Sequence, residues 1–202
     1  MMELYPKINS IFKRDDKGRF TCEYSCPEFE YLKNNEWVFT EKIDGTNIRI
    51  GWEDGKITIG GRTERAQIPA HLFDYLAQTF TADKFSDFEN VILFGEGYGQ
   101  KINGGEQYIP NGVGFILFDV KVGRWWLKRE DIEKIAEEFG VPVVPIVETG
   151  RLIDATEIVQ GGYMSLIADC KAEGFVLRPK VDLIMRGGER IITKVKTKDY
   201  RK

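Results

Sequence analysis

Residues 39–50 read FTEKIDGTNIRI, and this stretch sets the expected fold of the whole chain. Strand-forming residues stand on both sides of a turn in which Asp44 and Gly45 supply the turn chemistry. The pattern predicts two strands that meet at this turn, with Lys42 at the end of the first strand and facing a cavity. For this stretch alone, a hairpin that carries a surface lysine is an equally good interpretation.

Length and composition are those of a globular protein. The chain has 202 residues, of which 42% are hydrophobic and 30% are charged, and one compact domain with a substantial core is expected. No apolar run approaches the roughly 20 residues of a membrane helix, and Glu3 and Lys7 interrupt the start of the chain where a signal peptide would be apolar. Three cysteines and the single His71 form no zinc-ligand pattern, so the cytoplasm (the host cytoplasm for a viral protein) is the expected location.

Charge is distributed unevenly along the chain. The net charge is −3, but residues 180–202 hold eight basic and three acidic residues and therefore carry +5, which leaves −8 for the rest. A basic end on an acidic body suggests contact with a polyanion at one place. A basic tail that only solvates the end of the chain is the alternative.

The hydrophobic pattern predicts a mixture of helices and strands. Strand-forming runs alternate with turns over residues 36–63, which indicates three successive strands. Apolar residues at helical spacing predict helices over 69–85 and 128–139, and the second should end at Gly140. One or two short helices are expected over 152–170, and further strands over 91–94, 114–122, 173–179 and 190–196.

Glycines follow the strand predicted over 91–94. Residues 95–99 read GEGYG, but no helix follows them, so a dinucleotide-binding loop is excluded. Glu96 is expected at the end of the strand, among glycines that let a ligand approach the backbone closely. In the next strand, Phe115 and Phe118 fall on opposite faces. Periodicity favours core positions for both, with a position in a cleft for one of them as the alternative.

The last predicted strand places two lysines on one face. Residues 190–196 alternate between apolar and polar, so Lys194 and Lys196 share a face with Ile192. Two lysines in this arrangement suit a phosphate clamp. The same pattern is also typical of an exposed edge strand that is protected against aggregation.

Taken together and in this order, the segments resemble the motifs of the covalent nucleotidyltransferases, the superfamily of ATP-dependent ligases and capping enzymes. They are most similar to RNA ligases of the RNA ligase 2 type found in phages, on the strength of EKIDGTN at 41–47, EGFVLRP at 173–179 and the glycine-rich segment that runs through Gln100-Lys101. The matching positions are Lys42-Ile43-Asp44-Gly45 (motif I), Arg62 (the arginine motif), Phe94-Gly95-Glu96-Gly97 (motif III), Leu117-Phe118-Asp119 (motif IIIa), Glu173-Gly174-Phe175-Val176 (motif IV) and Lys194-Val195-Lys196 (motif V).

The resemblance covers the chain from about residue 30 to its end, and it implies a fold class. This is the α+β, ATP-grasp-like nucleotidyltransferase fold of ligases, with antiparallel sheets flanked by helices around a nucleotide cleft. A single nucleotidyltransferase domain is expected over residues 1–202. Because the chain ends soon after motif V, neither an OB domain nor a small helical C-terminal domain is expected.

The resemblance also implies a role for each matched residue. Lys42 would attack the α-phosphate of ATP and form a lysyl-adenylate, for which its amine must first lose a proton. Lys194, Lys196, Arg62 and a bound metal ion would assist that loss and neutralise the transferring phosphate. Catalytic roles are expected for Lys42, Asp44, Lys194 and Lys196, and nucleotide binding for Glu41, Asn47, Arg62, Glu96, Phe118 and Glu173.

Within this set the resemblance distinguishes base, ribose and metal contacts. Glu96 would accept hydrogen bonds from the ribose, and Phe118 would stack on adenine, which reverses the core position that periodicity favours. Glu41 would help to read the edge of the base, through its side chain or the neighbouring backbone. Glu173, with Asp44 as a second candidate, would hold a divalent ion, Mg²⁺ or alternatively Mn²⁺.

RNA is the implied partner. AMP would pass from the lysine to a 5′-phosphate, and a 3′-hydroxyl would then displace it. Arg62, Arg178 and Lys198 are the expected contacts to RNA phosphates, with Asn47 as a further candidate. A role in RNA repair, a monomeric state and no contact with membranes are expected as well.

Two other classes of protein stay open. A GTP-dependent capping guanylyltransferase or a minimal DNA ligase would share the motifs, although the absence of an OB domain counts against both. A nucleotide- or RNA-binding module that has lost catalysis is the other class, and the intact Lys42, Glu96 and Glu173 count against it. Nucleotide preference and the mass of the protein after incubation with ATP distinguish these alternatives.

Overall fold

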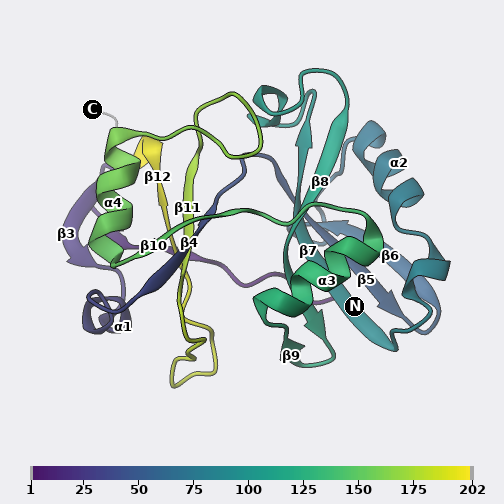
Figure 1. Cartoon of the computed structure of the whole chain (residues 1–202), viewed down its shortest axis with the longest axis horizontal. Helices are drawn as coiled ribbons and strands as arrows, with labels where there is room; N and C mark the ends of the chain where they lie inside the picture. Colours follow the sequence, from purple (N-terminus) through teal and green to yellow (C-terminus); the bar gives the residue numbers. More distant parts are fainter. Residues whose placement is uncertain (1, 201–202) are drawn as a thin grey trace. The chain divides into compact units, whose positions relative to one another are not determined.

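The computed structural model describes residues 2–200, which form two compact units (Figure 1). Residues 2–6 and 44–144 belong to unit 1, and residues 7–43 and 145–200 belong to unit 2. The chain passes between the units at Ile43 and Asp44, inside motif I. The expectation of one nucleotidyltransferase domain over residues 1–202 stays a prediction.

Unit 1 is built on a five-stranded antiparallel sheet with the strand order β6-β5-β7-β8-β9. The turn predicted between the strands that begin at Thr46 and Lys56 is an Asp-Gly hairpin. Asp54 and Gly55 in this turn both have positive φ angles, 51° and 75°. The strands are β5 (Thr46–Glu53), β6 (Lys56–Gly61), β7 (Asn90–Gly99), β8 (Val113–Val122) and β9 (Trp125–Trp126).

Helices of unit 1 help to close a hydrophobic core, and the two α-helices among them pack on strand β8. They are α2 (Ala70–Thr79), α3 (Arg129–Phe139) and the short 3-10 helices η1 (Ala82–Phe85) and η2 (Gly105–Gln107). Helix α3 buries the predicted face and ends at Gly140, whose φ of 68° needs a glycine. The single helix predicted over 69–85 is wrong, because Phe80 turns into the core and Thr81 is extended, which separates α2 from η1.

The first residues of the chain also belong to unit 1 and are anchored by a buried arginine. Arg49 is 1% exposed, and its guanidinium donates to Met2 O at 2.8 Å, to Gly61 O at 2.7 Å and to Glu64 Oε1 at 3.2 Å. A buried cation of this kind is tolerated only when its donors are satisfied. Arg49 therefore connects the start of the chain to β5 through hydrogen bonds. No local sequence pattern predicts this contact.

Unit 2 contains a five-stranded sheet and a separate two-stranded one. The larger sheet has the order β1-β12-β11-β4-β10 and is antiparallel except for the pair β1 and β12. Its strands are β1 (Asn9–Ser10), β4 (Trp37–Glu41), β10 (Ile146–Gly150), β11 (Gly174–Pro179) and β12 (Thr193–Lys196), and β2 (Phe12–Arg14) pairs with β3 (Phe20–Tyr24). The helices are α1 (Pro27–Tyr31), α4 (Leu152–Gly161) and the 3-10 helix η3 (Thr197–Tyr200).

Alternation along the strands of the larger sheet gives unit 2 its own core. Phe39, Phe175 and Val195 point from one face of the sheet and are fully buried. Helix α4 contacts β11 and β12, and Leu152, Ala155 and Val159 on it belong to the same core (Figure 1). The opposite face of the sheet is half-exposed, and it carries the charged residues described below.

The predicted α+β class, with antiparallel sheets flanked by helices, is confirmed by this arrangement. The strands predicted over 36–63, 114–122 and 173–179 are confirmed, whereas β7 is longer than predicted and β12 shorter. The strands β1, β9 and β10 were not predicted. In residues 2–200 no helix is both long and apolar enough to span a bilayer.

Candidate active site

Lys42 stands at the end of β4, as predicted. Its backbone N–H donates to Gly174 O at 2.8 Å, which extends the pairing of β4 with β11 by one residue. Because side chains alternate along a strand, Thr40 and Lys42 lie on the half-exposed face of the sheet. The β-pairing of motif I with motif IV thus fixes the direction in which the lysine points.

Glu173 lies directly before β11 and is shared by two lysines. Lys42 Nζ donates to Glu173 Oε2 at 2.6 Å, and Lys196 Nζ donates to Glu173 Oε1 at 2.5 Å. The side chains of Lys42, Glu173 and Lys196 are 21%, 8% and 19% exposed. These three residues form the ion cluster, in which one carboxylate balances two ammonium groups and one positive charge is left over.

The two ammonium groups set the charge state of Glu173. Burial alone would raise the pKa of this carboxyl, but the charge of Lys42 and the hydrogen bonds from Lys196 and Lys42 outweigh burial, so its pKa lies below its ordinary value. Glu173 is therefore ionised at neutral pH. A carboxylate in this state is able to hold a lysine or, in exchange, a divalent cation.

Lys194 and Arg178 lie on the same face of the sheet as the ion cluster. Lys196 pairs with Gly174 and Lys194 with Val176, so Lys194 and Lys196 share a face, as predicted. Strand β12 is paired on both sides, with β1 and β11, which rules out the edge-strand interpretation. The cationic face consists of Lys42, Arg178, Lys194 and Lys196.

Glu41 points the opposite way, into the core of unit 2. It is 1% exposed, and its carboxylate accepts hydrogen bonds from Ser165 Oγ at 2.5 Å and from Leu166 N at 2.8 Å. A buried carboxylate needs such donors. The side chain that was expected to help read the base is thus engaged inside the protein, and only the backbone beside it is left for that role. Sequence reasoning missed Ser165, which carries no motif.

In unit 1 the turn of motif I meets motif III. Glu96 pairs with Asn47 across β5 and β7. A Cβ atom on Gly45 would lie 3.0 Å from Glu96 Cγ and 2.3 Å from Gly97 O, so the turn packs directly on β7. The expectation that Glu96 ends a strand is wrong, because β7 continues through the glycines to Gly99. Glycines are tolerated in this strand because another backbone segment lies against them.

Asn47 has an unsatisfied polar atom. Its Oδ1 is buried and has no hydrogen-bond partner within the described part of the chain. Unpaired buried acceptors are rare in native proteins and often mark the place of an absent ligand or water. Asn47 Oδ1 therefore fits a hydrogen-bond donor from outside the chain, such as a hydroxyl group.

Phe118 is half-buried in β8, next to a shift in the register between β7 and β8. The ring of Tyr5 lies 5.1 Å from the ring of Phe118, edge to face, and Tyr5 donates to Asp119 Oδ2 at 2.8 Å. Phe115, by contrast, is fully buried in the core. Sequence reasoning missed Tyr5, since nothing near it in the sequence indicates contact with β8.

The remaining predicted contacts lie on the surface. Arg62 is exposed directly after β6 in unit 1, and Lys198 is exposed in η3 of unit 2. Arg201 and Lys202, which belong to the predicted basic end, lie outside the described residues. The structure thus brings Lys42, Glu173, Lys194, Lys196 and Arg178 together in unit 2 and Asn47 and Glu96 together in unit 1, where the carboxylate of Asp44 lies beside Gly104.

The donor set fits a divalent ion that arrives with a ligand. Among residues 2–200, no three His, Cys, Asp or Glu side chains gather into a ready-made metal site. Mg²⁺ is usually held by one or two carboxylates together with substrate phosphates and water. Glu173 would supply one carboxylate, and because both of its oxygens accept from lysines, a bound ion would have to replace one of these contacts.

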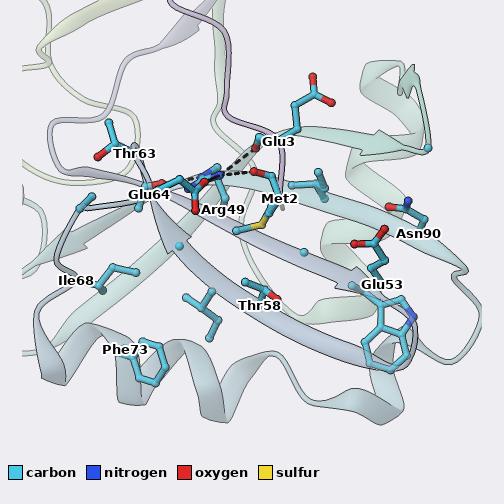
Figure 2. Close-up of a pocket in the computed structure, with 18 residues that line it drawn as sticks. Met2, Glu3, Arg49, Glu53, Thr58, Thr63, Glu64, Ile68, Phe73 and Asn90 are labelled. Atoms are coloured by element: carbon cyan, nitrogen blue, oxygen red, sulfur yellow. Dashed lines mark hydrogen bonds and ion pairs between the residues drawn. The ribbon is translucent and has the colours of Figure 1, made fainter.

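A cavity of about 580 Å³ lies beside β5 and β6 in unit 1 (Figure 2). Arg49, Thr58, Glu64 and Asn90 contribute polar atoms, and Met2 enters from the start of the chain. None of the predicted site residues is among the described residues that line it. Gly61 and Thr63, which flank the motif residue Arg62, are among its lining residues.

Solved structures of the Naegleria gruberi RNA ligase resemble this chain in fold. A mutant with ATP and Mn is 21% identical over 98% of this chain and 62% of its own, with a TM-score of 0.68. The ligase with PPi is 21% identical over 98% of this chain and 63% of its own (TM-score 0.67), and a mutant with AMP and Mn is 20% identical over 96% and 62% (TM-score 0.68). The chain thus spans less than two thirds of the length of these proteins, and the likeness shows the fold.

A comparison with curated proteins finds no match. A family model described as RNA ligase matches residues 35–196, which include every motif from Lys42 to Lys196. Because this match covers most of the chain and agrees with the fold, the protein belongs to the RNA ligase family.

Proposed function

We propose that this chain is the nucleotidyltransferase of an ATP-dependent RNA ligase, and that Lys42 carries AMP between ATP and RNA. The observation that supports this most directly is the ion cluster, in which Lys42 stands beside Glu173 and Lys196 on the cationic face. Related structures with ATP and Mn, with AMP and Mn and with PPi support the choice of nucleotide and metal. RNA as the acceptor is supported by the family.

In the first step the chain must release the lysine from its carboxylate. Lys42 Nζ donates to Glu173 Oε2 as an ammonium group, which has no lone pair for attack until it loses a proton. For attack, the contact between Lys42 Nζ and Glu173 must open and Lys42 must give up a proton to solvent. Glu173 would then be able to hold a divalent ion, which would supply neutralisation of the phosphate oxygens. Lys42 Nζ then bonds to the α-phosphorus, and the bond from that phosphorus to pyrophosphate breaks.

The cations around Lys42 have two tasks in this step. Lys194 and Lys196 lie on the same face and neutralise charge on the phosphate as it transfers. They also disfavour a third ammonium group beside them, which favours the neutral amine of Lys42 once Glu173 has moved away. Lys196 is the nearer of the two to this exchange, because it shares Glu173 with Lys42.

Residues of unit 1 are proposed to hold the nucleoside. Glu96 accepts hydrogen bonds from the ribose hydroxyls, and Phe118 stacks on adenine. Asn47 Oδ1, which is buried without a partner among residues 2–200, accepts a further hydrogen bond from the ligand or from water bound to it. Asp44 is the second proposed carboxylate for the divalent ion.

The later steps transfer AMP to RNA and join two ends. A 5′-phosphate oxygen attacks the adenylate phosphorus, and the bond between phosphorus and Lys42 Nζ breaks. A 3′-hydroxyl then attacks the 5′-phosphorus, and AMP leaves. Arg62, Arg178 and Lys198 are proposed to contact the RNA phosphates during these steps, since phosphate contacts position a strand without reading its sequence.

Transfer of label from nucleotide to protein and then to RNA tests this function. The protein is treated with pyrophosphate, freed of it, and incubated with Mg²⁺ and either ATP or GTP labelled in the α-phosphate. Label from ATP alone, followed by sealing of 5′-phosphate RNA as a single strand, a nick or a splinted pair, is the expected result. Label from GTP alone would assign the protein to the capping enzymes. No label from either nucleotide would indicate a nucleotide- or RNA-binding module that has lost catalysis.

A further inference from the structure

A loop of unit 1 forms hydrogen bonds with the turn of motif I. It runs from Gln100 to Tyr108, between β7 and β8, and is called the clamp loop below. Asn103 Nδ2 donates to Gly45 O at 2.5 Å, and Asp44 N donates to Tyr108 Oη at 3.3 Å. Two side chains of the clamp loop thus bind the main chain on both sides of the peptide that joins Asp44 to Gly45.

The contact between the clamp loop and Asp44 leaves no room for a side chain. A Cβ atom on Gly104 would lie 2.3 Å from Asp44 Oδ2. Gly104 has ordinary backbone angles, φ −81° and ψ 3°, so its conformation is open to any residue. The carboxylate of Asp44, and not the backbone, is therefore what a side chain at position 104 would displace.

The clamp loop holds a strained shape. Lys101 and Asn103 have positive φ angles, 59° and 43°, in a region that residues other than glycine rarely occupy. The surrounding structure maintains this shape, because Ile102 is 2% exposed in the core of unit 1 and Gly105 N donates to Ile102 O at 2.7 Å. Strained backbone of this kind is concentrated at functional sites.

From these contacts we propose that the clamp loop is a positioning device for the Asp44 carboxylate, with Asn103 and Gly104 as positioning residues. Asn103 fixes the turn, and Gly104 allows the carboxylate to lie flat against the loop. This inference rests on the proposed function, in which Asp44 helps to hold the divalent ion. It predicts that residues outside every motif matched in the sequence control the metal requirement of the first step.

The variant Asn103→Gly isolates the hydrogen bond to the turn. Glycine adopts positive φ without strain, so the backbone of the loop is preserved while the donor is lost. Asp54→Gly is the matched control, because Asp54 is also an exposed residue of unit 1 with positive φ, at a hairpin that does not touch the turn. Gly104→Ala is the second test variant, since its methyl group displaces the carboxylate itself.

The first measurement is independent of activity. Hydrogen exchange of the full chain, followed by mass spectrometry of peptides that cover residues 44–47, should be at least about fivefold faster in Asn103→Gly than in the wild type or in Asp54→Gly. Equal exchange rates in all three proteins would contradict the claim that Asn103 restrains the turn. The exchange measurement does not depend on activity. If the wild-type protein takes no label from ATP, that finding would contradict the proposed function but not the restraint of the turn by the clamp loop.

The second measurement is the rate of adenylylation at varied Mg²⁺ and varied ATP. In Asn103→Gly and Gly104→Ala the Mg²⁺ concentration at half-maximal rate should rise and the maximal rate should fall about tenfold, while half-saturation by ATP stays within about twofold. Asp54→Gly should match the wild type. Faster exchange of the turn with unchanged rates, or a loss that follows the melting temperature alone, would overturn the positioning role.

Discussion

At the scale of the residue, the account depends on how one carboxylate is divided between two lysines. Glu173 is more deeply buried than either lysine, and its pKa is lowered despite that burial. The sequence predicted the type and order of these residues, because each falls in a recognisable motif. It did not predict that Glu173 holds Lys42 directly, since that contact depends on the register of β4 against β11.

A pH series of unfolding measurements tests the state of Glu173. Its pKa in the folded protein lies below its ordinary value, so Glu173 stabilises the fold above the unfolded-state pKa of about 4.3, and this contribution is lost as pH falls through the folded-state pKa. The variant Glu173→Gln should lower the free energy of unfolding by about 2 kcal/mol at pH 7, measured with urea. The two proteins should converge as pH falls through the folded-state pKa of Glu173, which lies below its ordinary value.

An exposed ion pair provides the control for this series. Lys13 Nζ lies 2.8 Å from Glu23 Oε2 on the surface of unit 2, and the pKa of Glu23 is lowered by the hydrogen bond and charge of Lys13. Glu23→Gln should leave the unfolding free energy nearly unchanged at every pH, because exposed pairs contribute little. Equal losses in Glu173→Gln and Glu23→Gln would show that the ion cluster has no special electrostatic role.

The contacts of Glu41 and Asn103 could not be predicted from the sequence. The position of Glu41 beside the lysine suggested a nucleotide contact, but alternation along β4 turns its side chain into the core. Asn103 has no sequence signal at all. Its partner Gly45 is 58 residues away in the chain and is reached only because β5 and β7 pair. Contacts of this kind follow from tertiary structure and not from local pattern.

At the scale of the element, periodicity predicted the strands well and the boundaries less well. The three strands from β4 to β6 and the helix α3 appear where alternation and helical spacing placed them. Glycines misled the prediction in β7, since they usually weaken a strand. Here they let β7 pack closely, and a Cβ atom on Gly95 would lie 2.1 Å from the ring of Phe115 and 2.5 Å from Ile116 O.

Gly95→Ala tests this close packing. The added methyl group meets the buried ring of Phe115 and a carbonyl oxygen of β8, so the variant should lose about 2–3 kcal/mol of unfolding free energy. The control is Gly161→Ala at the end of α4, where nothing lies within 4 Å of the added atom. That variant should be unchanged or more stable by up to about 1 kcal/mol. Similar stability of both variants in urea would contradict the packing of β7 on β8.

At the scale of the whole molecule, the chain comprises two compact units, each with its own core. Composition predicted a single domain, and no feature of the sequence indicated that the chain would change units inside motif I. The uneven distribution of charge, by contrast, can be read directly from the sequence. The chain is acidic overall, and the +5 of residues 180–202 includes Lys194, Lys196 and Lys198. This local excess of positive charge supports the proposal that RNA phosphates are bound by electrostatic attraction.

Salt dependence of RNA binding tests that proposal. If Lys198 contacts a phosphate, Lys198→Ala should reduce the slope of log affinity against log salt by about 0.7 for a single-stranded RNA. Lys134→Ala removes the same charge from the exposed face of α3 and should leave the slope unchanged. Equal slopes in the two variants would place Lys198 outside the RNA interface and show that only net charge matters.

The central claim is that Lys42 becomes covalently adenylylated. Intact mass of the protein, stripped with pyrophosphate and then incubated with ATP and Mg²⁺, should increase by one AMP, and peptide mapping should place that AMP on Lys42. Lys42→Ala should gain no mass, and a cooperative melting transition should show that it is folded although it has lost the contact with Glu173. Retention of the adduct by a folded Lys42→Ala protein, or an adduct on another residue of the wild type, would contradict the account.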